Sequence, residues 1–309
     1  MIYTVTFNPA VDYVMHTGAL HPGMVNRSTA EEIYFGGKGI NVSLVLAELG
    51  VKSVALGFVA GFTGLAIEQG VQASGVATDF IHLSSGFSRI NVKLKSSEET
   101  ELNGQGPRID QSSLSQLFDR LDRLSEGDTL LLAGSIPSSL PQDIYPQMIS
   151  RVSRSGVRVI VDASGELLLR VLPHHPFLVK PNHLELGELF QTELHSADEV
   201  ARYAKKVQEM GARNVLVSMA GDGAVLLTED GNLLQCGVCS GTVVNSVGAG
   251  DSMLAGFMAG LVHGDAAYAL RLGTAAGGAT AFSDGLARRA LIAELLQQLG
   301  EKLFDSATG

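Results

Sequence analysis

Hydrophobic strand segments and helical segments alternate along most of this 309-residue chain. Apolar runs such as Leu130-Leu-Leu within 128–133 and Val159-Ile-Val within 157–162 are typical of strands buried on both faces. Because strands and helices follow one another in turn, the sequence predicts βαβ units around a mostly parallel sheet, an α/β fold. The predicted strands are 2–7, 54–59, 128–133, 157–162, 177–179 and 214–218, and the predicted helices are 38–49, 65–73, 111–124, 142–154, 183–190 and 197–210.

The C-terminal third is predicted to contain a hairpin and then a long helical region. Segments 223–227 and 232–236 flank Asp230-Gly231, a dipeptide that favours a tight β-turn. From Ala249 to about Phe282 the chain is rich in Ala and Gly and has helical character. Small residues on a helix allow close packing, so we expect this region to lie tightly against a sheet or a bound nucleotide.

Two β-prone, half-polar segments, about 11–35 and 88–104, interrupt the alternation and contain no helix pattern. They are either ordinary hairpins or the parts of a small separate sheet that covers one edge of the main domain as a lid. The sequence leaves both interpretations open.

Formal charge is −10, from 22 basic and 32 acidic residues, which argues against binding to nucleic acid or to an anionic membrane. No apolar run approaches the ~20 residues that span a bilayer, and the first residues do not form a basic leader. The only two cysteines, Cys236 and Cys239, cannot complete a zinc site by themselves and lie in a predicted strand and turn. We therefore expect a cytoplasmic protein in which this cysteine pair has no chemical role.

The strongest local feature is Asn245-Ser-Val-Gly-Ala-Gly-Asp-Ser, in which glycines precede a helix. The first N–H groups of a helix have no intrahelical acceptor and carry partial positive charge, so this turn could hold a phosphate. Asp251 could then accept the proton of a hydroxyl group that attacks the phosphate. Its alternative role is a simple helix cap.

A second glycine turn, Gly36-Gly-Lys-Gly-Ile-Asn41, also opens a helix. It is not a Walker A loop, because Lys38 is followed by Gly39 rather than Ser or Thr, and it could be only a tight turn with an exposed lysine. The chain has no G-x-G-x-x-G after its first strand, no H-E-x-x-H and no G-x-S-x-G. The sequence therefore lacks the motifs that would support a dinucleotide-dependent oxidoreductase, a metalloprotease or a serine hydrolase.

In Lys180-Pro-Asn-His-Leu-Glu, Asn182 and Glu185 lie one helical turn apart. Oxygen ligands at that spacing could hold a hydrated Mg²⁺ near a triphosphate. The alternative is an ordinary helix start with an early carboxylate.

These three elements occur together and in order, and at this point the chain resembles the ribokinase-like carbohydrate kinases over nearly its whole length. The resemblance implies one kinase domain over 1–309, a three-layer sandwich around a mostly parallel sheet, with a small β-sheet lid formed by 11–35 and 88–104. Further segments are similar to a branch of that family that acts on phosphosugars: Asn8-Pro-Ala-Val-Asp12, Arg89-Ile-Asn-Val-Lys-Leu, Glu99-Thr-Glu-Leu-Asn-Gly-Gln-Gly-Pro107 and Ala133-Gly-Ser-Ile-Pro137.

The activity that the resemblance implies is transfer of a phosphoryl group from ATP, with Mg²⁺, to the C6 hydroxyl of fructose 1-phosphate. A kinase for tagatose 6-phosphate or another phosphosugar, and a noncatalytic phosphosugar sensor, remain as alternatives. The resemblance also implies a homodimer that pairs through the lids.

The resemblance further assigns roles by position. Asp251 would be the base, and the amides of Gly248, Ala249 and Gly250 would stabilise the transferring group. The sugar phosphate would be held by Asp12, Gly37, Lys38, Asn41 and Arg89, with Asn103 and Ser135 as weaker candidates. Nucleotide contacts would come from Ser218, Gly221, Gly223, Gly250 and Gly277, and Mg²⁺ would be organised by Asn182 and Glu185.

Overall fold

A nine-stranded sheet forms the centre of the computed structural model, which describes residues 1–304. The strand order is β13-β12-β11-β10-β9-β8-β1-β4-β5, and every neighbouring pair is parallel except β11–β12 and β12–β13. The predicted α/β fold is confirmed. The strands are β1 (Ile2–Thr6), β4 (Ser53–Ala60), β5 (Ala77–Leu83), β8 (Thr129–Ala133), β9 (Arg158–Asp162), β10 (Leu178–Val179), β11 (Asn214–Ser218), β12 (Ala224–Leu227) and β13 (Leu233–Cys236).

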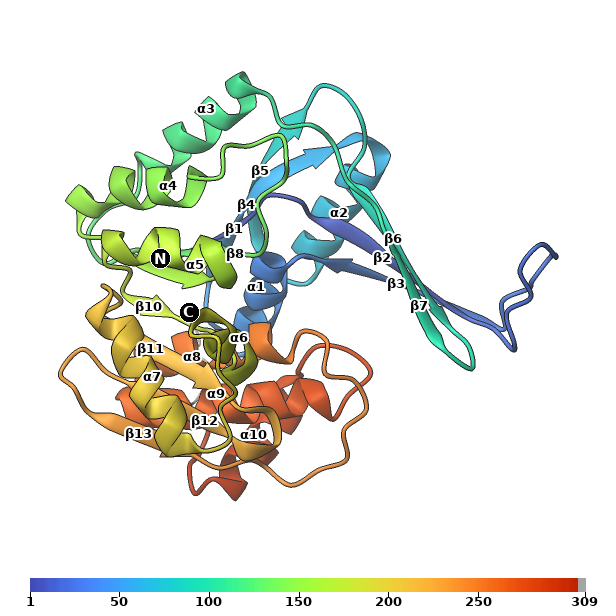
Figure 1. The fold of residues 1–309 in the computed structure, drawn as a ribbon. Coiled ribbons are helices and arrows are strands. Elements are labelled where there is room, and N and C mark those ends of the chain that lie inside the picture. Colours follow the sequence, from blue (N-terminus) through green and yellow to red (C-terminus); the bar gives the residue numbers. More distant parts are fainter. Residues whose placement is uncertain (305–309) are drawn as a thin grey trace.

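Helices cover both faces of this sheet and produce three layers (Figure 1). On β8, Leu130 and Leu132 contact the helices of one face, whereas Leu131 contacts those of the other, so a continuous apolar run buries both sides. One layer contains α3 (Gln111–Leu121), α4 (Ile144–Val152), α5 (Gly165–Val171), α6 (His183–Leu189) and α7 (Ala197–Glu209). The other contains α1 (Lys38–Glu48), α2 (Gly61–Ala73), α8 (Ala249–His263), α9 (Ala266–Ala281) and α10 (Arg289–Gln298).

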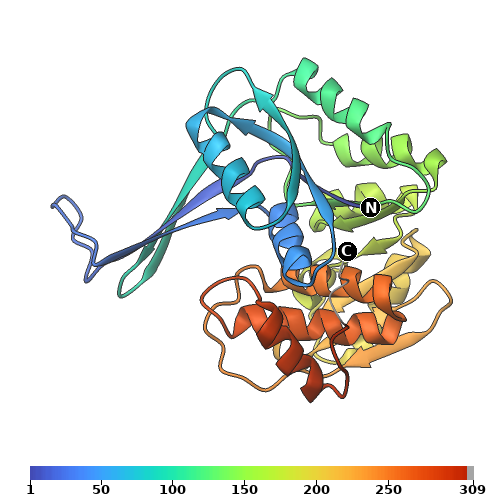
Figure 2. The same cartoon turned by 180° about the vertical axis from the view of Figure 1, so that it is seen from behind.

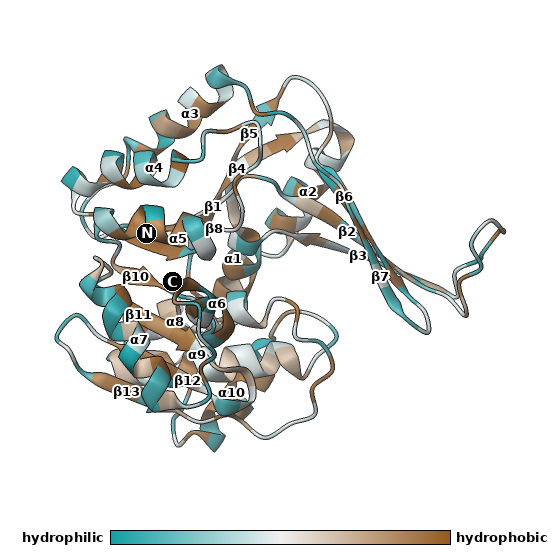
Figure 3. Cartoon of the chain, viewed as in Figure 1, coloured by the Kyte–Doolittle hydropathy of each residue, from teal (hydrophilic) through white to brown (hydrophobic). Residues whose placement is uncertain are grey.

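Hydropathy follows these layers, since the strands of the central sheet are mostly hydrophobic in Figure 3 and α7 carries hydrophilic residues on its outer side. The residues of α7 that are buried are Val200, Ala204 and Val207, spaced at helical intervals. No helix within the described residues is long and apolar enough to cross a membrane.

A second, four-stranded sheet, which we call the lid, projects from one side of the body (Figures 1 and 2). Its order is β3-β2-β6-β7, with β2 (Ala10–His16), β3 (Ala30–Gly36), β6 (Arg89–Lys95) and β7 (Glu99–Asn103). The two hairpins are joined by parallel pairing of β2 with β6. Segments 11–35 and 88–104 therefore form one separate sheet rather than two independent hairpins.

The region 249–282 differs from the expectation of one long helical region. It forms two helices, α8 and α9, and Asp265 caps the second by accepting a hydrogen bond from the Tyr268 N–H at 2.8 Å. The Ala- and Gly-rich sequence fits the close packing of these two helices, in which a Cβ added to Gly260 would lie 2.4 Å from the Ala269 Cα. Strand β5 and helices α5 and α10 were not predicted.

Candidate active site

The candidate site lies where the carboxyl ends of the parallel strands meet the start of α8. Ser135 follows β8, Asp162 ends β9, Lys180 follows β10 and Ser218 ends β11. In an open α/β sheet this edge is where ligands bind, because the loops that leave parallel strands converge there. The strand order places residues from four separate parts of the chain at one edge.

The turn before α8 presents free main-chain N–H groups. Gly248 adopts φ = 81°, a left-handed conformation that a side chain would disfavour. The N–H groups of Gly250 and Asp251 have no acceptor among residues 1–304, whereas the Ala249 N–H donates to the Ser246 carbonyl at 3.2 Å. Of the predicted amides, that of Gly250 is free to meet an anion, whereas the Ala249 N–H is already used within the turn. The Asp251 N–H, which was not among the predicted amides, is free as well.

The carboxylate of Asp251 is 6% exposed and accepts a hydrogen bond from Asn41 Nδ2 at 2.8 Å. Burial and the negative charge of Asp162 raise the pKa of Asp251 to about 6, although the Asn41 hydrogen bond and the ammonium groups of Lys38 and Lys180 oppose the shift. Asp251 is not a side-chain helix cap, since α8 has no side-chain cap hydrogen bond. The two glycine motifs thus meet in one hydrogen bond between positions 210 residues apart.

Two lysines and a second buried aspartate complete the charged part of the site. Asp162, which is 3% exposed, lies 3.4 Å from Lys38 Nζ through one oxygen and 3.4 Å from Lys180 Nζ through the other. Burial alone would raise the pKa of Asp162, but the two ammonium groups outweigh it and lower that pKa. Lys180 Nζ is also 3.2 Å from the position that a Cβ on Gly250 would occupy, so this ammonium group lies beside the start of α8.

On the lid, Asp12 borders this site, since its Oδ2 and the Asn41 side chain approach the same position over Gly36, and Arg89 lies within reach of the Asp12 charge. Asp12 accepts a hydrogen bond from Asn91 Nδ2 at 2.7 Å, and its other oxygen lies 2.9 Å from where a Cβ on Gly36 would be. Arg89 Nε donates to the Asn8 carbonyl at 3.1 Å, which ties the lid to the end of β1. Gly37 has φ = 129°, and a side chain there would collide with Thr6.

Asn182 and Glu185 form a capping box at the start of α6. Asn182 Oδ1 accepts from the Glu185 N–H at 2.8 Å, and Glu185 Oε2 accepts from the Asn182 N–H at 2.9 Å. Burial lowers the pKa of Lys38, but the negative charges of Asp162, Asp251 and Glu185 outweigh it and raise that pKa, so Glu185 acts electrostatically on the site. The cap occupies only one Glu185 oxygen and leaves Oε1 for another ligand.

The predicted nucleotide residues other than Gly250 lie at the end of β11, in the turn after it and in α9. Ser218 pairs with Asn182 through an isolated parallel bridge, and Gly221 lies in the short 3-10 turn 220–222 that follows β11. Gly223 has φ = 89° and closely approaches the Cys236 carbonyl, so a side chain is excluded there. Gly277 packs against the first turns of α8, where an added Cβ would lie 3.2 Å from the Ala249 carbonyl. The absence of a side chain at Gly277 therefore permits close contact between α8 and α9.

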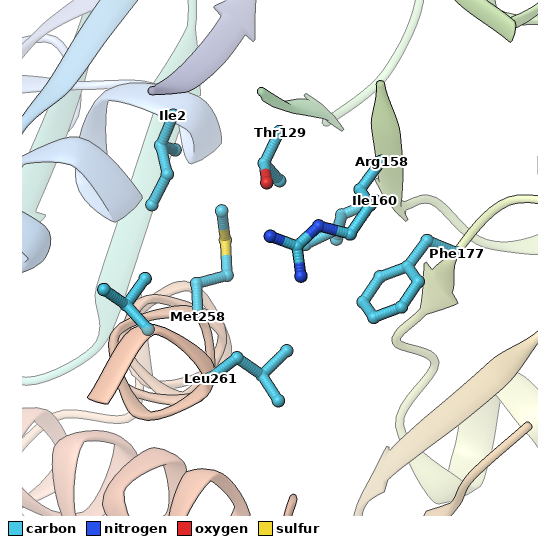
Figure 4. Close-up of a pocket in the computed structure, with 8 residues that line it drawn as sticks. Ile2, Thr129, Arg158, Ile160, Phe177, Met258 and Leu261 are labelled. Atoms are coloured by element: carbon cyan, nitrogen blue, oxygen red, sulfur yellow. The ribbon is translucent and has the colours of Figure 1, made fainter. Parts of the chain in front are cut away.

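The opposite, amino-terminal edge of the sheet contains a small cavity of about 20 Å³ (Figure 4). Arg158 points into it among Ile2, Thr129 and Met258. This volume holds about one water molecule, which is too little for a sugar or a nucleotide. We therefore place the functional site at the carboxyl edge.

Sequence reasoning missed Asp162, and it treated Lys180 only as part of a helix-start motif. A usable signal existed, because Asp162 is a charged residue that directly ends the apolar run Val159-Ile-Val. A carboxylate at the carboxyl end of a buried parallel strand points to the ligand-binding edge. Its partners Lys38 and Lys180 become apparent only once the strand order is known.

Comparison with known proteins shows which family the chain resembles. The family model described as pfkB family carbohydrate kinase matches residues 5–291. The chain is 47% identical over 300 residues to the 1-phosphofructokinase of Bacillus subtilis (strain 168). This alignment covers 97% of this chain and 98% of that protein. It is 38% identical over 288 residues to the D-tagatose-1-phosphate kinase of Bacillus licheniformis, which covers 93% and 94%. The crystal structure of phosphofructokinase-2 from Escherichia coli in complex with substrates and products has a TM-score of 0.90 at 28% identity, covering 97% and 99%.

Proposed function

The chain belongs to the pfkB family of carbohydrate kinases, and we propose that it is a 1-phosphofructokinase. The reaction is transfer of the γ-phosphoryl group of ATP to the C6 hydroxyl of fructose 1-phosphate, which gives fructose 1,6-bisphosphate and ADP. The observation that carries the proposal is the buried Asp251 carboxylate beside free N–H groups and two ammonium groups.

In this mechanism Asp251 accepts the proton of the C6 hydroxyl while the oxygen attacks the γ-phosphorus. A carboxylate with a pKa near 6 is ionised at neutral pH and is a stronger base than an ordinary aspartate. The N–H groups of Gly250 and Asp251, with Gly248 shaping their turn, stabilise the negative charge of the transferring group. Lys180 lies next to them, so we assign it to the phosphate as well.

The acceptor sugar is held between the lid and α1. Asp12 and Asn41 supply oxygen and amide partners for its hydroxyl groups, and Gly37 lets the main chain approach. Arg89 binds the phosphate group, with Asn103 and Ser135 as supporting contacts. Lys38, whose side chain is half-exposed and paired with Asp162, neutralises phosphate charge between the two substrates.

ATP is placed along the turns that contain Ser218, Gly221 and Gly223, with its triphosphate reaching Gly250. Glu185 fits a role toward Mg²⁺, because Oε1 is free of the capping box and the carboxylate faces the charged cluster. Asn182 fits a supporting role, since its side chain fixes the Glu185 main chain. When bound, Mg²⁺ supplies charge neutralisation on the β- and γ-phosphates.

We propose that the lid closes over the bound acceptor sugar. Phosphoryl transfer has to exclude water, because water otherwise competes with the sugar hydroxyl for the phosphoryl group. The lid carries Asp12 and Arg89, and its Tyr34 ring reaches the C-terminal half of the chain, 3.9 Å from the Cβ position of Gly285. A movement of the lid would therefore change both the sugar contacts and the exposure of the site.

The acceptor is tested with a panel of phosphosugars. We expect the purified protein to release ADP fastest with fructose 1-phosphate, more slowly with tagatose 1-phosphate and least with fructose 6-phosphate or tagatose 6-phosphate. The relatives named above include kinases whose substrates are named with the phosphate on C1, which favours that position. The measurement is initial rate of ADP release at saturating ATP, as kcat/KM for each sugar.

A preference for either 6-phosphate would reject the assigned acceptor. No turnover with any sugar, together with tight phosphosugar binding in calorimetry, would instead indicate a noncatalytic sensor. The intact Asp251 turn argues against that outcome.

We also propose that two subunits pair through the lids. One face of the lid is apolar across all four strands in the row Ile33–Tyr13–Val92–Leu102. Ile33 is 59% and Leu102 62% exposed, and an apolar sheet face of this kind is typical of a protein interface.

Ile33→Glu should convert the protein from dimer to monomer, because a carboxylate would be buried in the interface. Ala30→Glu, on the opposite face of the same strand, is the matched control and should leave the mass unchanged. Light scattering coupled to size exclusion measures both. A wild-type protein that is monomeric at every concentration, or an Ile33→Glu variant that stays dimeric, would contradict the pairing.

A further inference from the structure

Asn91 lies in the middle of a polar row that crosses the lid. The register pairs Tyr34 with Asp12, Asp12 with Asn91, and Asn91 with Asn103, so the row takes one residue from each strand. Residues directly opposite one another in a sheet share a face. This row therefore lies on the same face as Asp12, the side that borders the charged cluster.

The two ends of the Asn91 amide have different environments. Its Nδ2 donates to Asp12 Oδ1 at 2.7 Å, which fixes the orientation of the amide, since the opposite orientation would place two acceptors together. The side chain is 7% exposed, and its Oδ1 is buried without a hydrogen-bond donor among the described residues. A buried acceptor without a donor is unfavourable, and such groups in folded proteins call for an explanation.

We propose that Asn91 is a sugar-binding residue, whose Oδ1 accepts a hydrogen bond from a hydroxyl group of the acceptor while its Nδ2 orients Asp12. The inference deepens the function proposed above and rests on it. The bound sugar supplies the donor that the free protein lacks. Because Asn91 bonds only Oδ1 of Asp12, the other oxygen, Oδ2 over Gly36, remains for a second hydroxyl group of the sugar.

The chemistry of the position favours a hydroxyl group over the other parts of the substrates. A phosphate at neutral pH offers acceptors rather than donors, and the neighbouring Asp12 carboxylate repels it. A polyol supplies O–H donors with no charge. Asn103, the next residue in the row, belongs to the fully exposed strand β7, so the row reaches solvent at the edge of the lid.

Asn91→Leu tests the role, because leucine keeps the size of the side chain and removes both polar atoms. We expect the KM for the phosphosugar to rise at least ~10-fold and the KM for ATP to change less than twofold. Lys95→Met is the matched control: it lies on the same strand and face, roughly 13 Å farther out, and both KM values should stay as in the wild type. Should the leucine variant not fold, Asn91→Ser gives the same readout with a smaller side chain.

Acceptor analogues that lack one hydroxyl group separate a direct contact from a structural one. For the analogue that lacks the hydroxyl group bound by Asn91, the KM difference between the wild type and Asn91→Leu should shrink to the part that comes from the loss of Asp12 orientation, whereas the other analogues keep the full difference. An equal loss on every analogue, or an equal loss toward ATP, would overturn the inference. An active wild type whose KM is unaffected by Asn91→Leu rejects this inference alone, whereas an inactive wild type rejects the proposed function. If the wild type is inactive, calorimetric binding of fructose 1-phosphate to the wild type and to Asn91→Leu still tests the role of Asn91, which predicts weaker binding by the variant.

Discussion

Asp251→Asn is expected to lower kcat by at least ~10²-fold while ATP affinity and the fold remain nearly unchanged. The substitution keeps the shape of the side chain and an oxygen that can accept from Asn41 Nδ2, so the link between the two glycine motifs is retained. It removes only the basicity, and an amide cannot take the proton of the attacking hydroxyl. The expected loss is therefore confined to the chemical step.

Stopped-flow or coupled measurement of ADP formation gives kcat, and calorimetry gives ATP affinity. Asp230→Asn, in the turn between β12 and β13, is the matched control and should retain wild-type turnover. The effect on stability has a definite sign. Because the pKa of Asp251 is raised in the folded state, the stability that its neutral form contributes is lost as the pH rises from the ordinary aspartate value near 4 to about 6, and it is absent above that pH. Asp251→Asn should thus unfold no earlier than the wild type at pH 8. Turnover near the wild-type value would contradict the assigned role.

The second large effect is on pH dependence. A base acts in its ionised form, so the proposed role of Asp251 predicts that kcat/KM is constant at neutral pH and falls about tenfold per pH unit below pH 6, where the carboxylate takes up a proton. An aspartate with an ordinary pKa near 4 would instead keep most of its activity down to about pH 5. The loss between pH 6 and pH 4.5 should exceed about tenfold.

Initial rates at low acceptor concentration, measured from pH 4.5 to 8.5, give this profile. Circular dichroism over the same range checks that the protein remains folded. A plateau that extends below pH 5 in the folded protein would contradict a base with a pKa of about 6.

Much of the fold could be predicted because its signals are local. The run Leu130-Leu-Leu within β8 is apolar on both sides, and a strand with both faces buried implies helices above and below. The division of 249–282 into α8 and α9 is harder to predict from the sequence. Ala and Gly fit a helix and a helix contact equally well, and the break depends on the cap that Asp265 provides.

The site could be predicted only in part for a different physical reason. Asp251 and Asn41 belong to glycine turns that are visible in the sequence, and the structure joins them directly. Asp162 acquires its role from strand order, which places the end of β9 between the start of α1 and the residue after β10. Asn91 requires the register of the lid, because a shift of one residue would turn it to the apolar face.

The assignment of Asp251 as the base is tested by comparing the kcat/KM profile of Asn41→Leu with that of the wild type. Sugar phosphates themselves titrate near pH 6, so a wild-type inflection alone does not identify the group. The Asn41 hydrogen bond lowers the pKa of Asp251, and its removal should move the inflection to higher pH by a measurable amount, although the acceptor titrates as before. The predicted result is an inflection at higher pH in Asn41→Leu than in the wild type. The same inflection pH in both proteins would contradict the role of Asp251 as the base.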